Sequence, residues 1–278
     1  MSRSRLLETG GFNQLAAGRD GYFLYNCNDY YIGRSIEQYG EFSALEMKLF
    51  GQICSPGRIV IEVGANIGAH TVGLARLVGP QGRVLAFEPQ RLLFQTLCAN
   101  VALNSIENVD CFWAAVGAQE GFIDVPDLNP RKEYNFGGVT LLGAQGGRRV
   151  TCLTLDQYVT LPKVDLIKID VEGMEADVLR GSEKLLKQFK PVLYVENDRL
   201  EKSEALMRLI ASFDYRMYWH LPPLFNPSNF FANNENRYPS VVSVNMLCIH
   251  RDSPIRTTGF QEVVDFNFHP VPGQSAVK

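Results

Sequence analysis

The sequence lacks long hydrophobic runs and any excess of positive charge. Among its 278 residues, 27 Lys and Arg stand against 30 Asp and Glu, so the formal net charge is -3 at pH 7. This balance provides no basic field that would attract nucleic acid. No stretch reaches the roughly 18 apolar residues of a membrane-spanning helix, and the N-terminus has no apolar segment typical of a signal peptide. We therefore expect a cytoplasmic protein without a membrane span or a nucleic-acid partner.

Cysteine pairs are also missing. None of the six cysteines belongs to a C-x-x-C motif, and most lie in apolar runs. They are Cys27, Cys54, Cys98, Cys111, Cys152 and Cys248. We therefore expect buried, reduced thiols rather than disulfides or a zinc site.

From residue 58 onward, short apolar runs typical of buried strands alternate with segments of helical periodicity. The predicted strands are residues 59–63, 84–87, 109–113, 166–169 and 192–195. The predicted helices are residues 69–78, 92–104, 174–189 and 203–213. Strands that are apolar on both faces and alternate with helices predict an α/β fold, with a parallel sheet covered on both sides.

The alternation stops near the C-terminus. Residues 215–220 and 241–250 predict an antiparallel strand pair at one edge of the sheet. The loop between them, residues 221–239, is rich in Pro, Asn and Phe, and its aromatic content predicts that it is packed. Residues 117–151 contain short strand-like pieces and many glycines, which favours a β-hairpin insertion.

The chain divides into three parts by this pattern. We expect residues 1–57 to form an N-terminal cap over a ligand site and residues 58–250 to form the main domain. Residues 251–278 are expected to be a loosely ordered C-terminal tail.

The sharpest motif is IEVGANIGAHT at residues 61–71, where a buried strand is followed by a glycine-rich turn and a helix. Open parallel sheets bind ligands at the carboxyl ends of their strands. Gly64 would permit a tight turn and the close approach of a ligand to the backbone. Gly68 would allow the start of the helix to pack near the strand. Amide groups at the helix start then face an anionic group such as a cofactor carboxylate.

An acidic residue follows at the distance expected for adenosine binding. Glu88 ends the second strand about twenty residues after Gly68, and a carboxylate there can accept hydrogen bonds from both ribose hydroxyls. Asn66 occupies the second glycine position of the dinucleotide fingerprint, where a side chain obstructs a pyrophosphate. This favours a phosphate-free ligand, S-adenosylmethionine, over a nicotinamide or flavin dinucleotide. Glu62 can help to hold the amino group of that ligand.

Four segments together resemble the FkbM-type methyltransferases of the class I fold. They are VGANIGAHT, FEP, KIDVEGMEADVL and LYVEN, and DVEG-x-E is the most specific of these marks. The resemblance covers roughly residues 22–250. It implies a three-layer Rossmann-like fold whose seven-stranded, mostly parallel sheet has the order 3-2-1-4-5-7-6, with the last strand antiparallel. It also implies O-methylation, with glycans and secondary metabolites as typical substrates.

The expected cofactor site follows from the turn, the strand tips and the cap. Tyr39 and Glu41 precede a helical pattern in the cap, and residues there often close over the methionine end of the cofactor. For Glu41, ordinary helix capping is an alternative. His70, in the first helical turn, is interpreted as a packing residue. The expected cofactor-binding residues are Tyr39, Glu62, Gly64, Ala65, Asn66, Gly68, Thr71, Glu88, Ala114 and Asp170.

Methyl transfer to a hydroxyl requires a group that accepts the acceptor's proton. Asp170 ends the fourth strand, Glu196 ends the fifth, and His220 ends the sixth, so these three are the candidate bases. Lys168 is expected to point to the opposite side of the strand from Asp170. Glu172 and Glu175 follow. Charges at a helix N-terminus, where the helix dipole favours them, are one interpretation of both residues and the preferred one for Glu175.

A divalent metal ion is an alternative source of activation. Asp170, Glu196 and Asn197 offer three oxygen donors at neighbouring strand tips, which magnesium prefers, and catechol-type O-methyltransferases place similar groups there. The resemblance does not require a metal, so none is expected.

The sequence therefore predicts an S-adenosylmethionine-dependent O-methyltransferase that acts on a hydroxyl of a sugar, glycan or secondary metabolite. The loop at residues 221–239 is expected to shape the acceptor pocket, because aromatic rings stack on sugar faces. The alternatives are a nicotinamide-dependent oxidoreductase and a non-catalytic binding module with the same fold.

Overall fold

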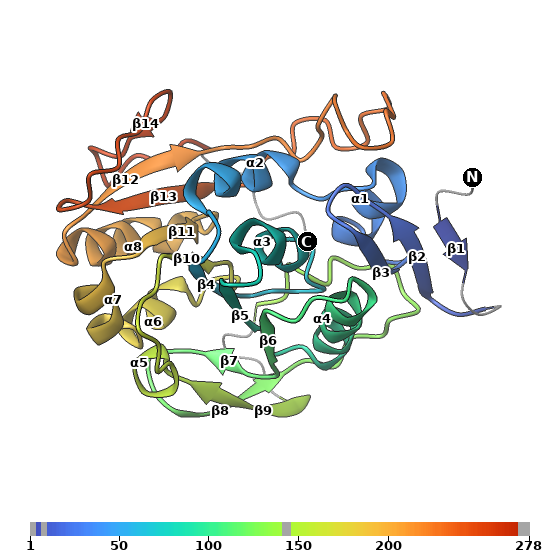
Figure 1. The fold of residues 1–278 in the computed structure, drawn as a ribbon, viewed down its shortest axis with the longest axis horizontal. Coiled ribbons are helices and arrows are strands. Elements are labelled where there is room, and N and C mark those ends of the chain that lie inside the picture. The colour runs from blue at the N-terminus through green and yellow to red at the C-terminus, as the bar shows by residue number, and fades with distance from the viewer. Residues whose placement is uncertain (1–3, 7–9, 141–145, 272–278) are drawn as a thin grey trace.

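The computed structural model describes residues 4–6, 10–140 and 146–271, and it is built around one central eight-stranded sheet (Figure 1). The order of the sheet is β14-β12-β13-β11-β10-β4-β5-β6. Its strands are β4 (Ile59–Val63), β5 (Arg83–Phe87), β6 (Val109–Phe112), β10 (Leu166–Ile169), β11 (Val192–Glu196), β12 (Tyr215–His220), β13 (Asn245–His250) and β14 (Gln261–Glu262).

The strand order confirms the α/β class and the predicted topology. The five strands from β6 to β11 are parallel, and β13 pairs antiparallel with both β11 and β12. Without β14, this is the order 3-2-1-4-5-7-6 that the resemblance implied. The expected count of seven strands was wrong by one, because residues 261–262 add a short antiparallel strand beside β12.

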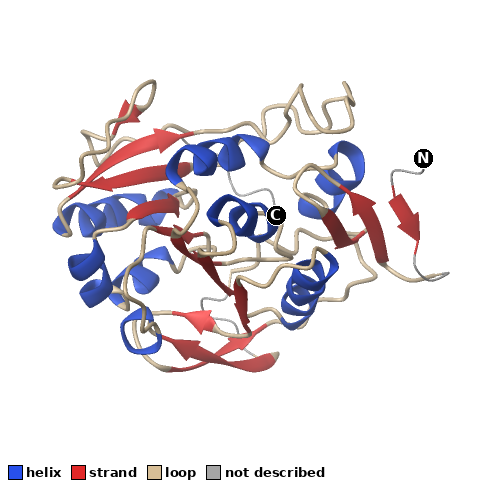
Figure 2. Ribbon diagram, viewed as in Figure 1, coloured by secondary structure: helices blue, strands red, loops and turns tan. Residues whose placement is uncertain are grey.

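Helices cover both faces of the sheet, so the architecture has three layers (Figure 2). One face carries α2 (Ala44–Ile53) and α3, whose Phe50 and Leu74 pack on Val60 and Leu166. The other face carries α6, α7 and α8, whose Leu179, Leu186 and Met207 belong to the largest apolar cluster. The helices of this domain are α3 (Thr71–Val78), α4 (Arg91–Leu103), α5 (Leu155–Tyr158), α6 (Glu175–Arg180), α7 (Glu183–Phe189) and α8 (Leu200–Ser212).

The single helix predicted at residues 174–189 is two helices in the structure. The chain breaks at Gly181, where a Cβ atom would lie 2.0 Å from the backbone oxygen of Gly117. The backbone of the helical layer therefore touches the backbone of a neighbouring loop at this point, and only glycine fits.

The N-terminal residues form a small sheet and two helices. Strands β1 (Ser4–Leu6), β2 (Asn13–Ala17) and β3 (Tyr22–Asn26) are antiparallel, and α1 (Ile32–Tyr39) and α2 (Ala44–Ile53) follow. Phe23 and Ile36 pack against Ile67 of the glycine-rich turn. The N-terminal segment is thereby fixed to the residues that end β4.

The segment at residues 117–151 contains the predicted hairpin. Strands β8 (Gly121–Val125) and β9 (Arg148–Leu153) are antiparallel, and β7 (Ala115–Val116) adds to β9 in parallel. Residues 134–138 run next to the N-terminal segment, because the Tyr30 amide donates to the Tyr134 oxygen at 3.0 Å.

The C-terminal residues up to position 271 are ordered against the domain, so the expectation of a loose tail was wrong for them. The Val263 amide donates to the Met217 oxygen beside β14. His269 is buried, and its Nε2 atom lies 2.8 Å from the Asn197 oxygen. Residues 272–278, also assigned to the tail, lie outside the described residues.

Three smaller expectations concern the loop, the cysteines and the membrane. The loop at residues 221–239 is packed as predicted, because Leu224 and Tyr238 form an apolar cluster with Tyr39. All six cysteines are free thiols, and three of them are buried. Within the described part of the chain, no helix is long and apolar enough to cross a membrane.

Candidate functional site

A cavity of about 530 Å³ opens at the carboxyl ends of β4, β5, β10 and β11. The glycine-rich turn supplies Gly64, Ala65 and Asn66 to its wall, and the neighbouring strand tips supply Glu88 and Asp170. A second, smaller cavity of about 40 Å³ adjoins it and shares Gly64, Glu88 and Asp170. Several of the residues chosen from the sequence thus meet at one cleft, where ligands of open parallel sheets bind.

Gly64 brings the turn directly against the tip of β10. Its φ angle is +84°, and a Cβ atom at this position would lie 1.8 Å from the backbone oxygen of Asp170. Gly68 also has a positive φ, but a Cβ there would meet Leu97 of α4 at 2.8 Å. Gly68 does not line the cavity and serves the packing of the turn on a helix.

Glu88 is buried and held in a fixed orientation. Its Oε2 atom accepts a hydrogen bond from the Asn66 amide at 2.9 Å, and Oε1 accepts one from the Gln90 amide at 2.8 Å. Burial raises its pKa to about 7, although the two backbone hydrogen bonds act in the opposite direction. Ala114, another expected cofactor-binding residue, lines the small cavity together with Glu88.

Glu62 and Thr71 are joined by a hydrogen bond at the wall of the larger cavity. The Thr71 hydroxyl donates to Glu62 Oε2 at 2.6 Å, and Glu62 lines the cavity while Thr71 does not. Burial raises the pKa of Glu62 to about 7, and Lys168 opposes this shift. Thr71 therefore orients Glu62 rather than facing a ligand.

Lys168 points toward Asp170, and the expectation that it faces the other side was wrong. Its Nζ atom donates to Asp170 Oδ2 at 3.0 Å, and both residues line the cavity. Residues two apart on a strand share a face, so the sequence pattern itself predicts this pair. Burial opposes ionisation of Asp170, but the nearby Lys168 charge outweighs it and lowers the pKa of Asp170.

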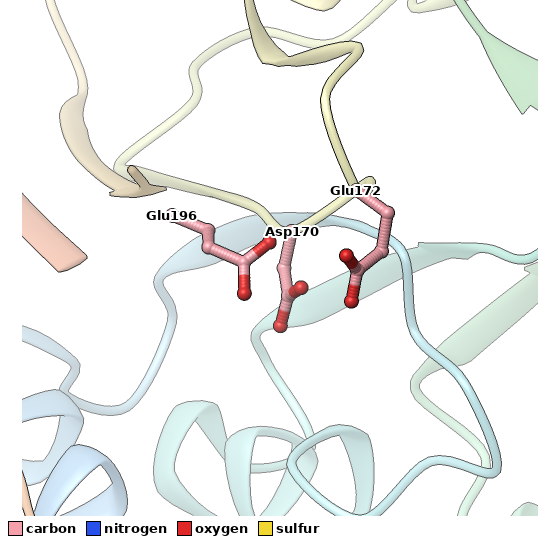
Figure 3. Close-up of side chains that lie close together, drawn as sticks. All are labelled: Asp170, Glu172 and Glu196. Atoms are coloured by element: carbon pink, nitrogen blue, oxygen red, sulfur yellow. The ribbon is translucent and has the colours of Figure 1, made fainter. Parts of the chain in front are cut away.

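Three carboxylates meet at the tips of β10 and β11: Asp170, Glu172 and Glu196 (Figure 3). One oxygen atom of each lies within 4.8 Å of the others. Glu172 has a φ angle of 54°, in the left-handed region, and its carboxylate forms an ion pair with Arg199. Burial and the charge of Asp170 raise the pKa of Glu172 to about 8 and hold that of Glu196 well above its usual value.

A comparison with models of protein families identifies the family of this chain. A model described as the methyltransferase FkbM domain matches residues 62–217, more than half of the chain. The chain belongs to the FkbM methyltransferase family. The match begins inside β4 and ends in β12, so it includes the turn, Glu88 and the three-carboxylate cluster.

Individual relatives are more distant. The chain is 27% identical over 143 residues to methyltransferase 1 of Beauveria bassiana, which covers 44% of this chain and 57% of that protein. It is 26% identical over 155 residues to methyltransferase sdnD of Sordaria araneosa, which covers 44% and 59%. The chain therefore matches little more than half the length of these two relatives. A solved methyltransferase FkbM from Methylobacillus flagellatus KT has a TM-score of 0.47 and 17% identity over 79% of this chain and 55% of that chain.

The three candidate metal ligands, Asp170, Glu196 and Asn197, do not face one common point in the cavity. Asn197 does not line the cavity, and its Nδ2 atom lies 3.4 Å from the sulfur of Met246. Glu172 stands nearest to Asp170 and Glu196 instead. Because Lys168 and Arg199 already neutralise two of these three carboxylates, the cluster fits a divalent cation poorly.

Two further candidates lie outside the cavity. His220 Nδ1 is 2.8 Å from the Tyr194 hydroxyl, and burial lowers the pKa of His220 to about 4. The Tyr39 hydroxyl donates to the Glu235 oxygen at 3.0 Å and so fixes the aromatic loop. Neither side chain lines the cleft. A base role for His220 and a direct cofactor contact for Tyr39 therefore have no geometric support.

Several lining residues had no signal in the sequence. Glu46 of α2 reaches the cavity, whereas Glu41 binds Arg19, Asn226 and the Phe230 amide within the cap and loop. Further lining residues that sequence reasoning missed include His70, Gln90, Asn135, Gly137, Gly138, Glu172, Asp198, Arg199, His269 and Val271. They come from segments far apart in the chain, so no local spacing marks them. Of these, only His70, in the IEVGANIGAHT motif, and Glu172, in the DVEG motif, stood within a recognised pattern.

Proposed function

We propose that this FkbM-family methyltransferase uses S-adenosylmethionine to methylate a hydroxyl oxygen of a sugar, glycan or secondary metabolite. The observation that carries the proposal is the fixed carboxylate of Glu88 between two cavities at the glycine-rich turn. Its two backbone hydrogen bonds aim it into the cleft, where a carboxylate can accept bonds from both ribose hydroxyls.

The hydrogen bonds of the turn argue against a dinucleotide. A pyrophosphate needs free amide donors at the turn. Here the Asn66 amide donates to Glu88, and the Ile67 amide donates to Asn66 Oδ1 at 2.8 Å. Both donors are used within the chain, which suits a ligand without phosphates and counts against the oxidoreductase alternative.

Methyl transfer needs an acceptor hydroxyl that is aligned with the methyl group and a side chain that accepts the hydroxyl proton. S-adenosylmethionine supplies a methyl group on a positively charged sulfur when it is bound. The Asp170 carboxylate, kept ionised by Lys168, is placed to hold the acceptor's hydroxyl proton in a hydrogen bond and to receive it. Glu196 Oε2 is buried and has no hydrogen-bond partner among the described residues, so it is free to orient the same hydroxyl.

Part of the cavity wall is apolar. Tyr31, Phe42, Leu224 and Val241 contribute to it, and such surfaces suit the apolar faces of a sugar ring or of a carbon skeleton. Among the described lining residues, seven are Asp or Glu and two are Lys or Arg. A polyanionic acceptor is disfavoured there, so we propose a small molecule or glycan and no nucleic acid.

Calorimetric titration tests the cofactor, and product detection tests the reaction. We expect S-adenosylmethionine and S-adenosylhomocysteine to bind and NADH not to bind. Glu88→Ala should lower the affinity for both adenosyl ligands at least about tenfold. Incubation with a panel of sugars and polyketide alcohols should release S-adenosylhomocysteine only with a hydroxyl acceptor. Unchanged affinity in Glu88→Ala would overturn the assignment.

A further inference from the structure

Four ionisable side chains are buried together at one end of the larger cavity. They are Glu46 of α2, Glu62 of β4, His70 at the N-cap position of α3 and Lys168 of β10. In the sheet, Lys168 is the register partner of Glu62. Glu88 follows β5 on the other side of β4, so these groups lie across the first strand from the proposed ribose site.

The charges of this group do not balance. Lys168 is the nearby cation, and it faces the carboxylates of Asp170, Glu62 and Glu46, which together outweigh its burial and raise its pKa. Buried charge without a partner is unfavourable. In their ionised forms these residues place three negative charges against one ammonium group. Burial raises the pKa of Glu46 and that of Glu62, so the ligand-free site favours their protonated forms, and a second positive group, which no described residue at this end of the cavity supplies, would favour the ionised forms.

His70 gives an independent sign of a missing ligand. Its side chain is 6% exposed, and its Nε2 atom has no hydrogen-bond partner among the described residues. The ring packs near Phe42 and Phe50, with centroid distances of 5.7 Å to each. Glu46 Oε2 lies 3.7 Å from Nε2, which is too far for a hydrogen bond. His70 lines the cavity, and a buried polar atom that lacks a partner in such a residue points to a bound polar group.

Two hydrogen bonds hold the Glu46 carboxylate in a fixed position. Its Oε1 atom accepts bonds from the Ser43 hydroxyl at 2.7 Å and from Asn245 Nδ2 at 3.2 Å. Ser43 lies just before α2 and Asn245 begins β13, so both the cap and the sheet position this carboxylate. Glu46 lies outside the segment matched by the family model.

We propose that Glu46 and His70 recognise the amino-acid end of the cofactor, with Glu46 facing its ammonium group and His70 donating from Nε2 to its carboxylate. This inference rests on the proposed use of S-adenosylmethionine. An amino acid carries one positive and one negative group, so it satisfies the carboxylate excess and the unpaired imidazole nitrogen together. The N-terminal cap would then contribute to cofactor selection through Glu46.

Two probe ligands distinguish the binding of the amino-acid end of the cofactor from the binding of its adenosine part. S-adenosylhomocysteine and 5′-methylthioadenosine share adenine, ribose and a thioether, but the second lacks the amino-acid group. We expect Glu46→Gln and His70→Phe to weaken S-adenosylhomocysteine about tenfold, because each removes a charge-assisted hydrogen bond. Their affinity for 5′-methylthioadenosine should stay within about twofold. Gln keeps the volume of Glu46, and Phe keeps the ring packing of His70.

Glu41→Gln is the matched control, because Glu41 is a buried carboxylate of the same cap that does not line the cavity. It should leave the ratio of the two affinities unchanged. Equal weakening of both probes by Glu46→Gln and His70→Phe would show a structural role and overturn the inference. If either variant fails to fold, wild type still decides, because equal affinity for the two probes excludes an amino-acid pocket. Binding of neither probe to wild type would overturn the proposed function as well.

Discussion

Lys168 and Asp170 form an ion pair across one face of β10, with Nζ donating to Oδ2 at 3.0 Å. The lysine side chain is 2% exposed, while that of the aspartate is 39% exposed and opens on the cavity. The pair thus places a fixed negative charge at the surface of the cleft and its counter-charge beneath it. The turn at Gly64 packs against the backbone oxygen of Asp170, so the glycine-rich turn and the candidate base form one structural unit.

Lys168→Met should destabilise the fold, because it leaves buried carboxylates without their cation. Removing one partner of a buried pair costs about 3 kcal/mol, the lower end of the usual range, since Asp170 is partly exposed. Urea unfolding measures this free energy. Lys187→Met is the control, because its partner Glu183 and Lys187 are both exposed, and it should change stability by about 0.5 kcal/mol or less. Equal losses in the two variants would contradict the structural role of Lys168.

Gly64→Ala should abolish cofactor binding. The substitution places a methyl group 1.8 Å from the Asp170 oxygen at a φ of +84°, so the turn must separate from β10. Gly57→Ala isolates the conformational part, because Gly57 has a φ of +83° and nothing within 4 Å of the added carbon. We expect Gly57→Ala to cost about 1–2 kcal/mol in unfolding experiments and to retain S-adenosylhomocysteine binding. Retained binding in Gly64→Ala would show that the turn is not part of the site.

Glu88 should make the ligand-free protein less stable as the pH rises. Burial raises the pKa of its carboxyl group from the ordinary value of 4.5 to about 7 in the folded protein. Between these values the folded protein holds a proton that the unfolded chain has lost, so the free energy of unfolding falls with increasing pH. Glu88→Gln removes this contribution. The stability of wild type relative to Glu88→Gln should therefore fall by about 2–3 kcal/mol from about pH 4 to about pH 8. A pH-independent difference would place Glu88 in a solvated environment.

Methyl transfer should not depend on a divalent cation. Two carboxylates of the three-carboxylate cluster are already paired, Asp170 with Lys168 and Glu172 with Arg199. We expect exhaustive EDTA treatment to leave the rate of S-adenosylhomocysteine formation unchanged, and added magnesium to have no effect. A loss of activity that magnesium restores would show that the cluster is a metal site.

Most of the topology could be predicted because it follows from local patterns. Apolar runs of four or five residues marked β4, β10 and β11, and their alternation with helices requires a parallel sheet. The position of Glu88 after β5 was likewise fixed by the length of one strand–helix–strand unit. The Lys168–Asp170 pair was available from the same reasoning, since side chains two apart on a strand share a face.

The remaining differences between the expected and the observed positions arise from contacts between distant segments. The break at Gly181 depends on the backbone of Gly117, and Asn197 turns toward Met246 rather than toward the cavity. His220 was placed at a strand end by its pattern, but its neighbour Tyr194 belongs to another strand and takes its ring nitrogen. No periodicity along the chain encodes such pairings.

The sequence by itself determined the order of the elements, the glycine-rich turn and the carboxylate that follows it, because these depend on neighbours within a few tens of residues. Only the tertiary structure decided that Glu46 from the cap, the segment around Gly137 and His269 from the C-terminal residues line the same cleft. The physical reason is that a cavity wall is made by packing. Residues from any part of the chain can contribute to it, and what selects them is the shape of the folded core rather than their own spacing.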